Sequence, residues 1–297
     1  MPQLLRSVRS IRWRGSRRAG VPLATALVAV LVALAGCVSS SGPAGPAAPT
    51  GPTQNAQRTA NGKDIVTQSD KTDLDRRADI HLDLAREYYK NRQYTTAIDE
   101  IKQALVSRPD RADAYMLRAL AYWGLGDNAT ADESFRRALQ LRPNDPDTML
   151  NYGTFLCGVN RYGDADAQFS AVEQIPNYVG IARVVFQQGV CQAQAGDLAT
   201  AEKTLAHAYE LDASSAYTAY HLSLVLYRRG QFDRARFYIR RINMREDVVT
   251  APSLWLAARI ERKLGNDEGV QSFGRQLHER FPQASETQLF DKGRFDD

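Results

Sequence analysis

The sequence predicts an all-α protein in which a signal peptide and a disordered linker precede a right-handed superhelix of six helix-turn-helix repeats. Three observations predict it. Arg108-Pro109 and Arg142-Pro143 lie 34 residues apart, and small residues recur with the same period over the rest of the chain. A basic and then apolar leader opens the sequence, and a stretch almost free of large apolar residues follows it.

The first 36 residues have the order of charge and hydropathy that is typical of an exported protein. This leader contains six Arg and no acidic residue. Its apolar run from Val21 to Ala35 is shorter than the ~20 residues of a membrane-spanning helix. The run ends in Leu34-Ala35-Gly36-Cys37, which resembles the lipobox of bacterial lipoproteins. The resemblance implies a signal peptide over 1–36 and lipidation of Cys37 as the first mature residue.

The residue after Cys37 predicts the membrane to which the chain is sorted. It is Val38 and not Asp, and by analogy with enterobacterial sorting this favours the periplasmic face of the outer membrane, with the lipid as anchor. Loss of the leader removes six positive charges from a chain of net charge +4, which leaves −2. No net basic charge then remains to indicate a nucleic-acid partner.

Residues 37–75 predict a flexible linker. From Ser39 to about Asn61 the chain is made of Ser, Gly, Pro, Ala, Thr and Gln, which bury too little apolar surface to offset the entropy of ordering. We expect a tether between Cys37 and the folded part.

The 34-residue period is that of the tetratricopeptide repeat. Placing each Pro at position 32 puts small residues at positions 8, 20 and 27, where two helices of a hairpin approach closely; Ala85, Ala97 and Ala104 show this in the first repeat. The last repeat matches least well, as a terminal capping repeat does. The predicted repeat domain covers 76–290, with a tail at 291–297 and repeats at 78–111, 112–145, 146–181, 182–215, 216–249 and 251–284.

The concave groove of such an array is the candidate protein-binding site. Positions 2, 5, 9 and 12 of each first helix point into it, and here they carry aromatic residues, Met and Arg, which are enriched at protein interfaces. The alternative is that some of them only contact the neighbouring repeat. The candidates, centred on repeats one and two, are Leu82, Arg86, Tyr89, Met116, Leu120, Trp123, Tyr220 and Tyr227.

Two cysteines remain after Cys37 and suggest a disulfide. Cys157 and Cys191 lie 34 residues apart, late in the first helices of adjacent repeats. Such helices run side by side about 9–10 Å apart, so facing positions satisfy the ~7 Å limit between the Cα atoms of a disulfide. We predict a Cys157–Cys191 disulfide; the alternative is two inert buried thiols.

No pattern indicates catalysis, a metal or a cofactor. The four His residues are scattered without metal-ligand spacing, and no nucleophile elbow, phosphate loop or zinc-protease helix occurs. The sequence predicts a binding protein and not an enzyme.

Beyond the generic repeat, several strings resemble one family. The strings are Asn151-Tyr152-Gly153-Thr154-Phe155-Leu156-Cys157, Leu226-Tyr227-Arg228, and Leu277-His278-Glu279-Arg280-Phe281-Pro282. They are similar to the type IV pilus biogenesis lipoproteins called PilW or PilF, which are pilotins. The resemblance implies binding to the pilus secretin, whose outer-membrane localisation and multimer assembly pilotins promote. We expect a monomer.

A scaffold of a different envelope assembly is the alternative. Tetratricopeptide lipoproteins also serve the β-barrel insertion machinery and act as adaptors for peptidoglycan hydrolases. The genes that neighbour this one discriminate between these functions.

Overall fold

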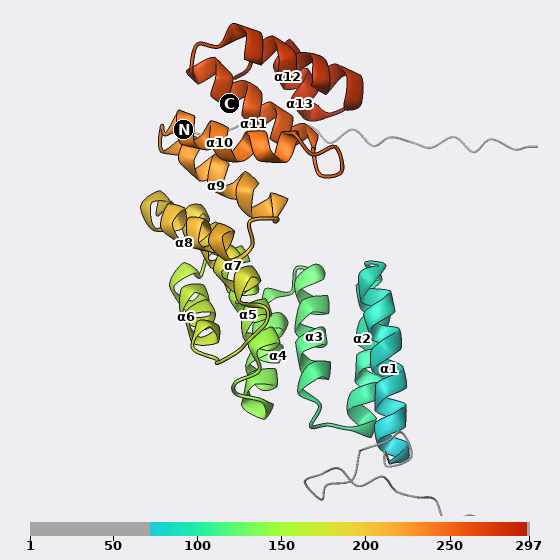
Figure 1. Cartoon of the computed structure of the whole chain (residues 1–297). Coiled ribbons are helices and arrows are strands. Elements are labelled where there is room, and N and C mark those ends of the chain that lie inside the picture. The colour runs from blue at the N-terminus through green and yellow to red at the C-terminus, as the bar shows by residue number, and fades with distance from the viewer. Residues whose placement is uncertain (1–71, 296–297) are drawn as a thin grey trace, which may run out of the picture. The chain divides into compact units, whose positions relative to one another are not determined.

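A computed structural model describes residues 72–295, which belong to one compact unit. Within 72–295 every regular element is a helix (Figure 1). The signal peptide, Cys37 and nearly all of the linker lie outside the described residues. No helix between residues 72 and 295 has the length and apolar character needed to cross a membrane.

Twelve of the helices form six antiparallel hairpins, and a further helix follows them, so the prediction of an all-α array of six helical hairpins is confirmed. The hairpins are α1 (Asp73–Lys90) with α2 (Tyr94–Ser107), α3 (Ala112–Gly124) with α4 (Asn128–Leu141), α5 (Pro146–Gly158) with α6 (Tyr162–Glu173), α7 (Ile181–Gln194) with α8 (Leu198–Leu211), α9 (Ala216–Arg228) with α10 (Phe232–Asn243), and α11 (Ala251–Lys263) with α12 (Asp267–Arg280). The last helix is α13 (Ser285–Asp291).

The turn inside each hairpin needs one residue in the left-handed region. Four hairpins place a glycine there with φ between 70° and 90°, at Gly126, Gly196, Gly230 and Gly265. Glycine adopts this conformation without a steric penalty and commonly ends helices. The next helix then begins at a side chain that accepts a hydrogen bond from its first turn; Asp127 and Asp197 do so for α4 and α8.

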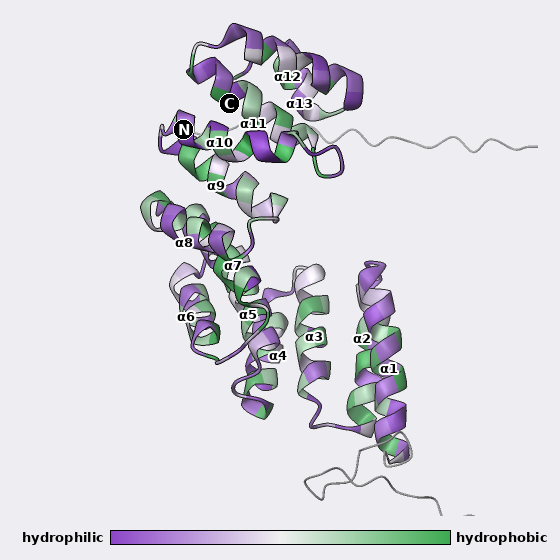
Figure 2. Ribbon diagram, in the orientation of Figure 1, coloured by the Kyte–Doolittle hydropathy of each residue, from purple (hydrophilic) through white to green (hydrophobic). Residues whose placement is uncertain are grey.

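The two helices of a hairpin approach closely because their facing residues are small. A Cβ atom added to Gly153 of α5 would lie 2.7 Å from the ring of Phe169 of α6, and one added to Gly189 of α7 would lie 2.7 Å from Leu205 of α8. In the first two hairpins Ala occupies these positions and is fully buried. Most helices accordingly contain both hydrophobic and hydrophilic residues (Figure 2).

Buried acidic groups tie neighbouring repeats together. Asp132 of α4 accepts hydrogen bonds from the Tyr152 hydroxyl at 2.7 Å and from Arg161 at 2.9 Å, both in the third repeat. Burial and then this bond to Asp132 raise the pKa of Tyr152 to about 12. Glu202 of α8 likewise accepts from Gln231 and Arg234 of the fifth repeat.

Helical structure extends beyond the repeat pattern at both ends of the array. Helix α1 begins at Asp73, inside the segment assigned to the linker, because Thr72 accepts a hydrogen bond from the Asp75 amide and starts the helix before the first repeat position. Helix α13 packs on α11 and α12, with Phe290 against Gly274. It lies beyond the 34-residue pattern, which does not predict it.

Candidate functional site: the face of the first helices

The first helices α1, α3, α5, α7, α9 and α11 follow one another side by side, each in contact with the next. The second helices form the other layer of the array (Figure 1). The exposed side of the first helices is therefore one continuous face, which we call the groove face.

Seven of the eight predicted groove residues keep accessible surface in the structure. Leu82 does not: it is fully buried and packs against residues of both α2 and α3, so its nomination was wrong. Position 5 of the first repeat lies in the core formed by α1, α2 and α3 and not on the groove face. The accessible residues are Arg86, which is exposed, and Tyr89, Met116, Leu120, Trp123, Tyr220 and Tyr227, which are half-buried.

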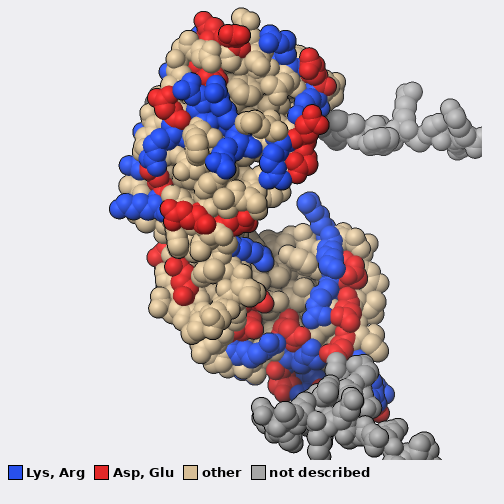
Figure 3. Space-filling view, in the orientation of Figure 1, with Lys and Arg blue, Asp and Glu red and all other residues tan. Residues whose placement is uncertain are grey.

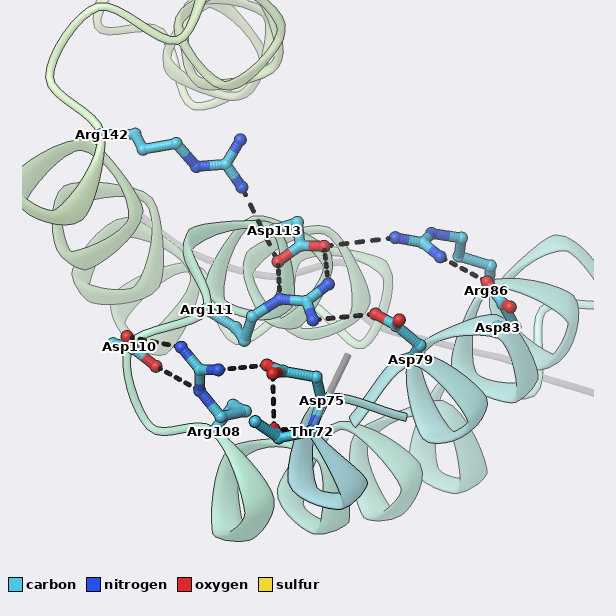
Figure 4. Close-up of polar contacts among 10 residues, drawn as sticks. All are labelled: Thr72, Asp75, Asp79, Asp83, Arg86, Arg108, Asp110, Arg111, Asp113 and Arg142. Carbon is cyan, nitrogen blue, oxygen red and sulfur yellow. Dashed lines mark hydrogen bonds and ion pairs between the residues drawn. The ribbon is translucent and has the colours of Figure 1, made fainter. Parts of the chain in front are cut away.

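At the amino-terminal end of the groove face, Arg86 is held in a network of ion pairs (Figure 4). It donates to Asp83 at 2.6 Å and lies 3.5 Å from Asp113. Asp113 also accepts two hydrogen bonds from Arg111, at 2.8 and 2.9 Å, and lies 3.7 Å from Arg142. The charge of Arg86 is thus largely balanced within the chain.

The same network extends along α1 and fixes this end of the array. Arg111 donates to Asp79 at 2.8 Å, and Arg108 pairs with Asp75 (Figure 4). Burial raises the pKa of the Asp113 carboxyl, but its hydrogen bonds and ion pair with Arg111 outweigh that effect and hold the pKa below its usual value.

The middle of the groove face contains a pocket of about 250 Å³ between α3, α5 and α7. Trp123 forms one wall and packs edge-on against Phe155, with ring centroids 5.7 Å apart. A Cβ atom on Gly158 would lie 2.9 Å from the Trp123 ring, so only glycine leaves room for it. The accessible lining residues, which we call the central pocket, are Trp123, Thr154, Gly158, Gln187, Val190 and Gln194.

Five of these six residues are absent from the sequence-based candidates. The signal that could have found two of them is the register itself, because Thr154 and Val190 occupy position 9 of repeats three and four. The side chains of Gln187 and Gln194 add amide groups beside the apolar walls, and Gln187 donates to Thr154 at 3.3 Å. Apolar walls with nearby amides suit an extended peptide, whose backbone needs both donors and acceptors.

Cys157 and Cys191 are joined by a disulfide that lies next to the central pocket. Their Cα atoms are 5.7 Å apart, both residues are buried, and Cys157 itself lines the pocket. The bond connects α5 to α7 and so holds two walls of the pocket together.

At the carboxyl-terminal end, the chain itself occupies the groove face. The Phe295 ring lies 5.0 Å from that of Trp255, and Arg259 donates from Nε to the Phe295 carbonyl at 2.9 Å. The Arg259 guanidinium also lies over the ring of the predicted groove residue Tyr227, at 4.8 Å. This end of the face therefore already holds an aromatic side chain and a backbone carbonyl.

The titratable groups of the groove face are held in packing contacts and ion pairs. His221 packs against Phe186 and Tyr220, and burial lowers its pKa. Among residues 72–295, no cluster of three or more His, Cys, Asp and Glu side chains is placed to hold a metal ion. What the described face offers is binding chemistry: aromatic walls, amides and paired guanidinium groups.

Comparison with known proteins identifies the fold as that of tetratricopeptide-repeat proteins. Residues 82–146 match the family model of the tetratricopeptide repeat. The chain is similar to the crystal structure of PilW, a widely conserved type IV pilus biogenesis factor, with 31% sequence identity and a TM-score of 0.66 over 71% of this chain and 97% of that chain. No curated protein matches the sequence significantly.

Two further solved structures show likeness in fold alone. PilF of Pseudomonas aeruginosa has 24% identity and a TM-score of 0.64, over 75% of this chain and 100% of that chain. A tetratricopeptide repeat protein of Parabacteroides merdae has 15% identity and a TM-score of 0.55, over 72% of this chain and 83% of that chain.

Reduction of the Cys157–Cys191 disulfide is expected to lower the free energy of unfolding by about 3–4 kcal/mol, because the bond closes a 34-residue separation in the unfolded chain. Urea unfolding followed by circular dichroism, with and without reductant, measures the change. A Cys157→Ala/Cys191→Ala variant is the control and must not respond to reductant. Equal stability of the oxidised and reduced protein would contradict the prediction.

Replacement of Asp113 by Asn is expected to destabilise the protein by about 1.5–3 kcal/mol at pH 7, because it removes the negative charge and replaces one of the two oxygens that accept from Arg111 by an NH2 donor. The folded pKa of Asp113 lies below its usual value of 3.8, so its stabilising contribution is present above that pH and is lost as pH falls through the folded pKa. The difference between wild type and variant must therefore shrink at acidic pH. Asp99→Asn, at an exposed carboxylate, is the matched control; a difference that does not depend on pH would refute the assignment.

Proposed function

The chain belongs to the tetratricopeptide-repeat proteins, which are typically non-enzymatic scaffolds, and we propose that within them it is a PilW-type component of type IV pilus assembly. The observation that supports this most is the similarity to PilW, which extends over 97% of that chain and 71% of this one. The central pocket supplies a place for a protein segment to bind.

In this proposal the protein is a lipoprotein of the outer membrane that acts as a pilotin. Lipidated Cys37 anchors it at the periplasmic face, and the residues between Cys37 and Asp73 form the tether. A flexible chain of that length has a root-mean-square reach of roughly 30–35 Å. The repeat domain then binds the pilus secretin and promotes its localisation to the outer membrane and its assembly into multimers.

The central pocket is the proposed contact for an extended secretin segment. Trp123 and Val190 would contact an apolar side chain of that segment, and the amides of Gln187 and Gln194 would bond its backbone. The contacts of Phe295 with Trp255 and Arg259 support this chemistry, since there the groove face receives an aromatic ring and a carbonyl from the chain itself. The disulfide keeps α5 and α7 in place while the segment binds.

Deletion of the gene is expected to abolish the high-mass secretin multimer that an unheated gel of outer membranes reveals. The wild-type gene should restore the multimer, whereas Cys37→Ala should restore it only weakly because the cargo then lacks its membrane anchor. Thr154→Arg should also fail, since a long cation would fill the central pocket, and Val106→Arg on the exposed side of α2 is its matched control.

Each outcome separates the parts of this proposal. An unchanged multimer and normal surface pili in the deletion strain would overturn the pilotin function and favour a scaffold of the β-barrel insertion machinery or of peptidoglycan hydrolases. Full activity of a soluble, correctly folded Thr154→Arg protein would overturn only the central pocket as the binding site.

A further inference from the structure

Helix α10 carries large apolar and basic side chains on its outward side. The Phe237 side chain is 55% exposed and that of Met244, at the end of the helix, 81% exposed. Arg241 and Arg245 lie at helical spacing beside them. We call these four residues the α10 face. It belongs to the layer of second helices, whereas the groove face belongs to the first helices.

The other repeats show that the fold does not require this composition. Phe237 is the sixth residue of its second helix, and the repeats place an exposed or half-exposed small or charged residue at the same point. The equivalent residues are Asp99, Glu133, Ala167, Lys203 and Ser272. Because the hairpins are otherwise alike, an exposed aromatic in one of them points to a role other than stability.

The aromatic part of the α10 face is held in a defined position. The Phe237 ring packs edge-on against Tyr238 at 5.1 Å, and Tyr238 packs in the same way against Tyr209 of α8 at 5.2 Å. The Arg241 guanidinium lies 5.5 Å from the centre of the Phe237 ring. Little side-chain freedom therefore remains to be lost when a partner binds.

A depression of about 500 Å³ adjoins this face, at the junction of repeats four and five. Its walls include Tyr209 and Ala219, and its rim includes Met244 and the two guanidinium groups of Arg241 and Arg245. It is large enough to accept an apolar side chain, with positive charge at its entrance.

The charge of the fifth repeat is strongly positive. Residues 216–249 contain seven Arg and three acidic residues, although the chain after the predicted leader has a net charge of −2. Figure 3 shows Lys and Arg gathered over α9, α10 and α11. Four of these Arg pair with buried acids, Arg229 and Arg234 with Glu202, and Arg236 and Arg240 with Glu261.

The Arg residues of the α10 face do not pair with buried acids. Among the described residues Arg241 has no carboxylate partner, and its guanidinium lies over the Phe237 ring. Arg245 pairs with the exposed Asp247 at 2.9 Å and donates to the Ser214 carbonyl at 3.2 Å. A carboxylate that approached the depression would meet both guanidinium groups.

We propose that the α10 face is a second protein-docking surface, which binds a segment that presents acidic side chains beside an aromatic or aliphatic one. The apolar residue enters the depression, and its acidic neighbours pair with Arg241 and Arg245. The depression favours a protein segment over a membrane surface, and Asp233, Glu246 and Asp247 in the same repeat would repel an anionic bilayer. This inference does not depend on the proposed pilus function.

A synthetic peptide with aspartates and glutamates around one phenylalanine tests the proposal, with a peptide of the same length carrying lysines as the charge control. The protein without its predicted leader, residues 37–297, is labelled with ¹⁵N and titrated. The acidic peptide is expected to shift the amide signals of Tyr209, Phe237, Arg241 and Met244. These shifts should become smaller with added salt and should be absent with the lysine peptide.

Three variants assign the binding to the α10 face. Phe237→Glu introduces the residue type that repeat two has at this point, and Arg241→Gln removes a charge that has no carboxylate partner among the described residues. Each variant is expected to weaken binding of the acidic peptide at least about tenfold and to leave the circular dichroism spectrum unchanged. Val106→Gln, at the position in repeat one that corresponds to Met244, is expected to have no effect.

Several results would overturn the proposal. The first is absence of binding, or shifts confined to the first helices. The second is binding to phosphatidylglycerol vesicles that requires Phe237 and Arg241 while the acidic peptide does not bind, which would make the face a membrane contact. The third is self-association of the chain, removed by Phe237→Glu, which would assign the face to a second copy.

Discussion

The close approach of two helices at small residues is the constraint on which the rest of this structure depends. Where Gly153 meets Phe169 and Gly189 meets Leu205, a single added carbon atom would clash, and fully buried Ala residues serve the same purpose in the first two hairpins. A hairpin closed in this way still has apolar sides to bury, so it packs on its neighbours and the repeats form an array. First helices then share one face and second helices the other.

Because the repeats are equivalent, differences between them show where binding is expected. At its amino-terminal end the groove face is held by paired charges around Asp113, and at its carboxyl-terminal end it is covered by Phe295. The central pocket between these ends keeps apolar walls and amides accessible, next to the one disulfide of the described residues. On the other layer, only repeat five places a large aromatic at the exposed sixth position of its second helix.

Features that recur with the 34-residue period were predictable from sequence, whereas most features that occur once, the Cys157–Cys191 disulfide excepted, were not. The six hairpins follow from Ala, Gly and Pro spacing, because these residues determine where helices approach and end. Leu82 was misassigned because the period alone does not distinguish a groove position from a core position. Tertiary contacts outside the repeat pattern determine helix α13, the position of Phe295 and the ion pairs of Arg86. No periodic signal in the sequence predicts these features.

The central claim is that the central pocket binds a segment of the pilus secretin, and site-specific photo-crosslinking in living cells tests it most directly. A photoreactive amino acid is placed at Val190 in the pocket, and in a second strain at Val106, which is 78% exposed on α2. A crosslink to the secretin from residue 190 and none from residue 106 is the expected result. Equal crosslinking from both positions, or none from residue 190 in cells whose secretin multimer requires this protein, would contradict the account.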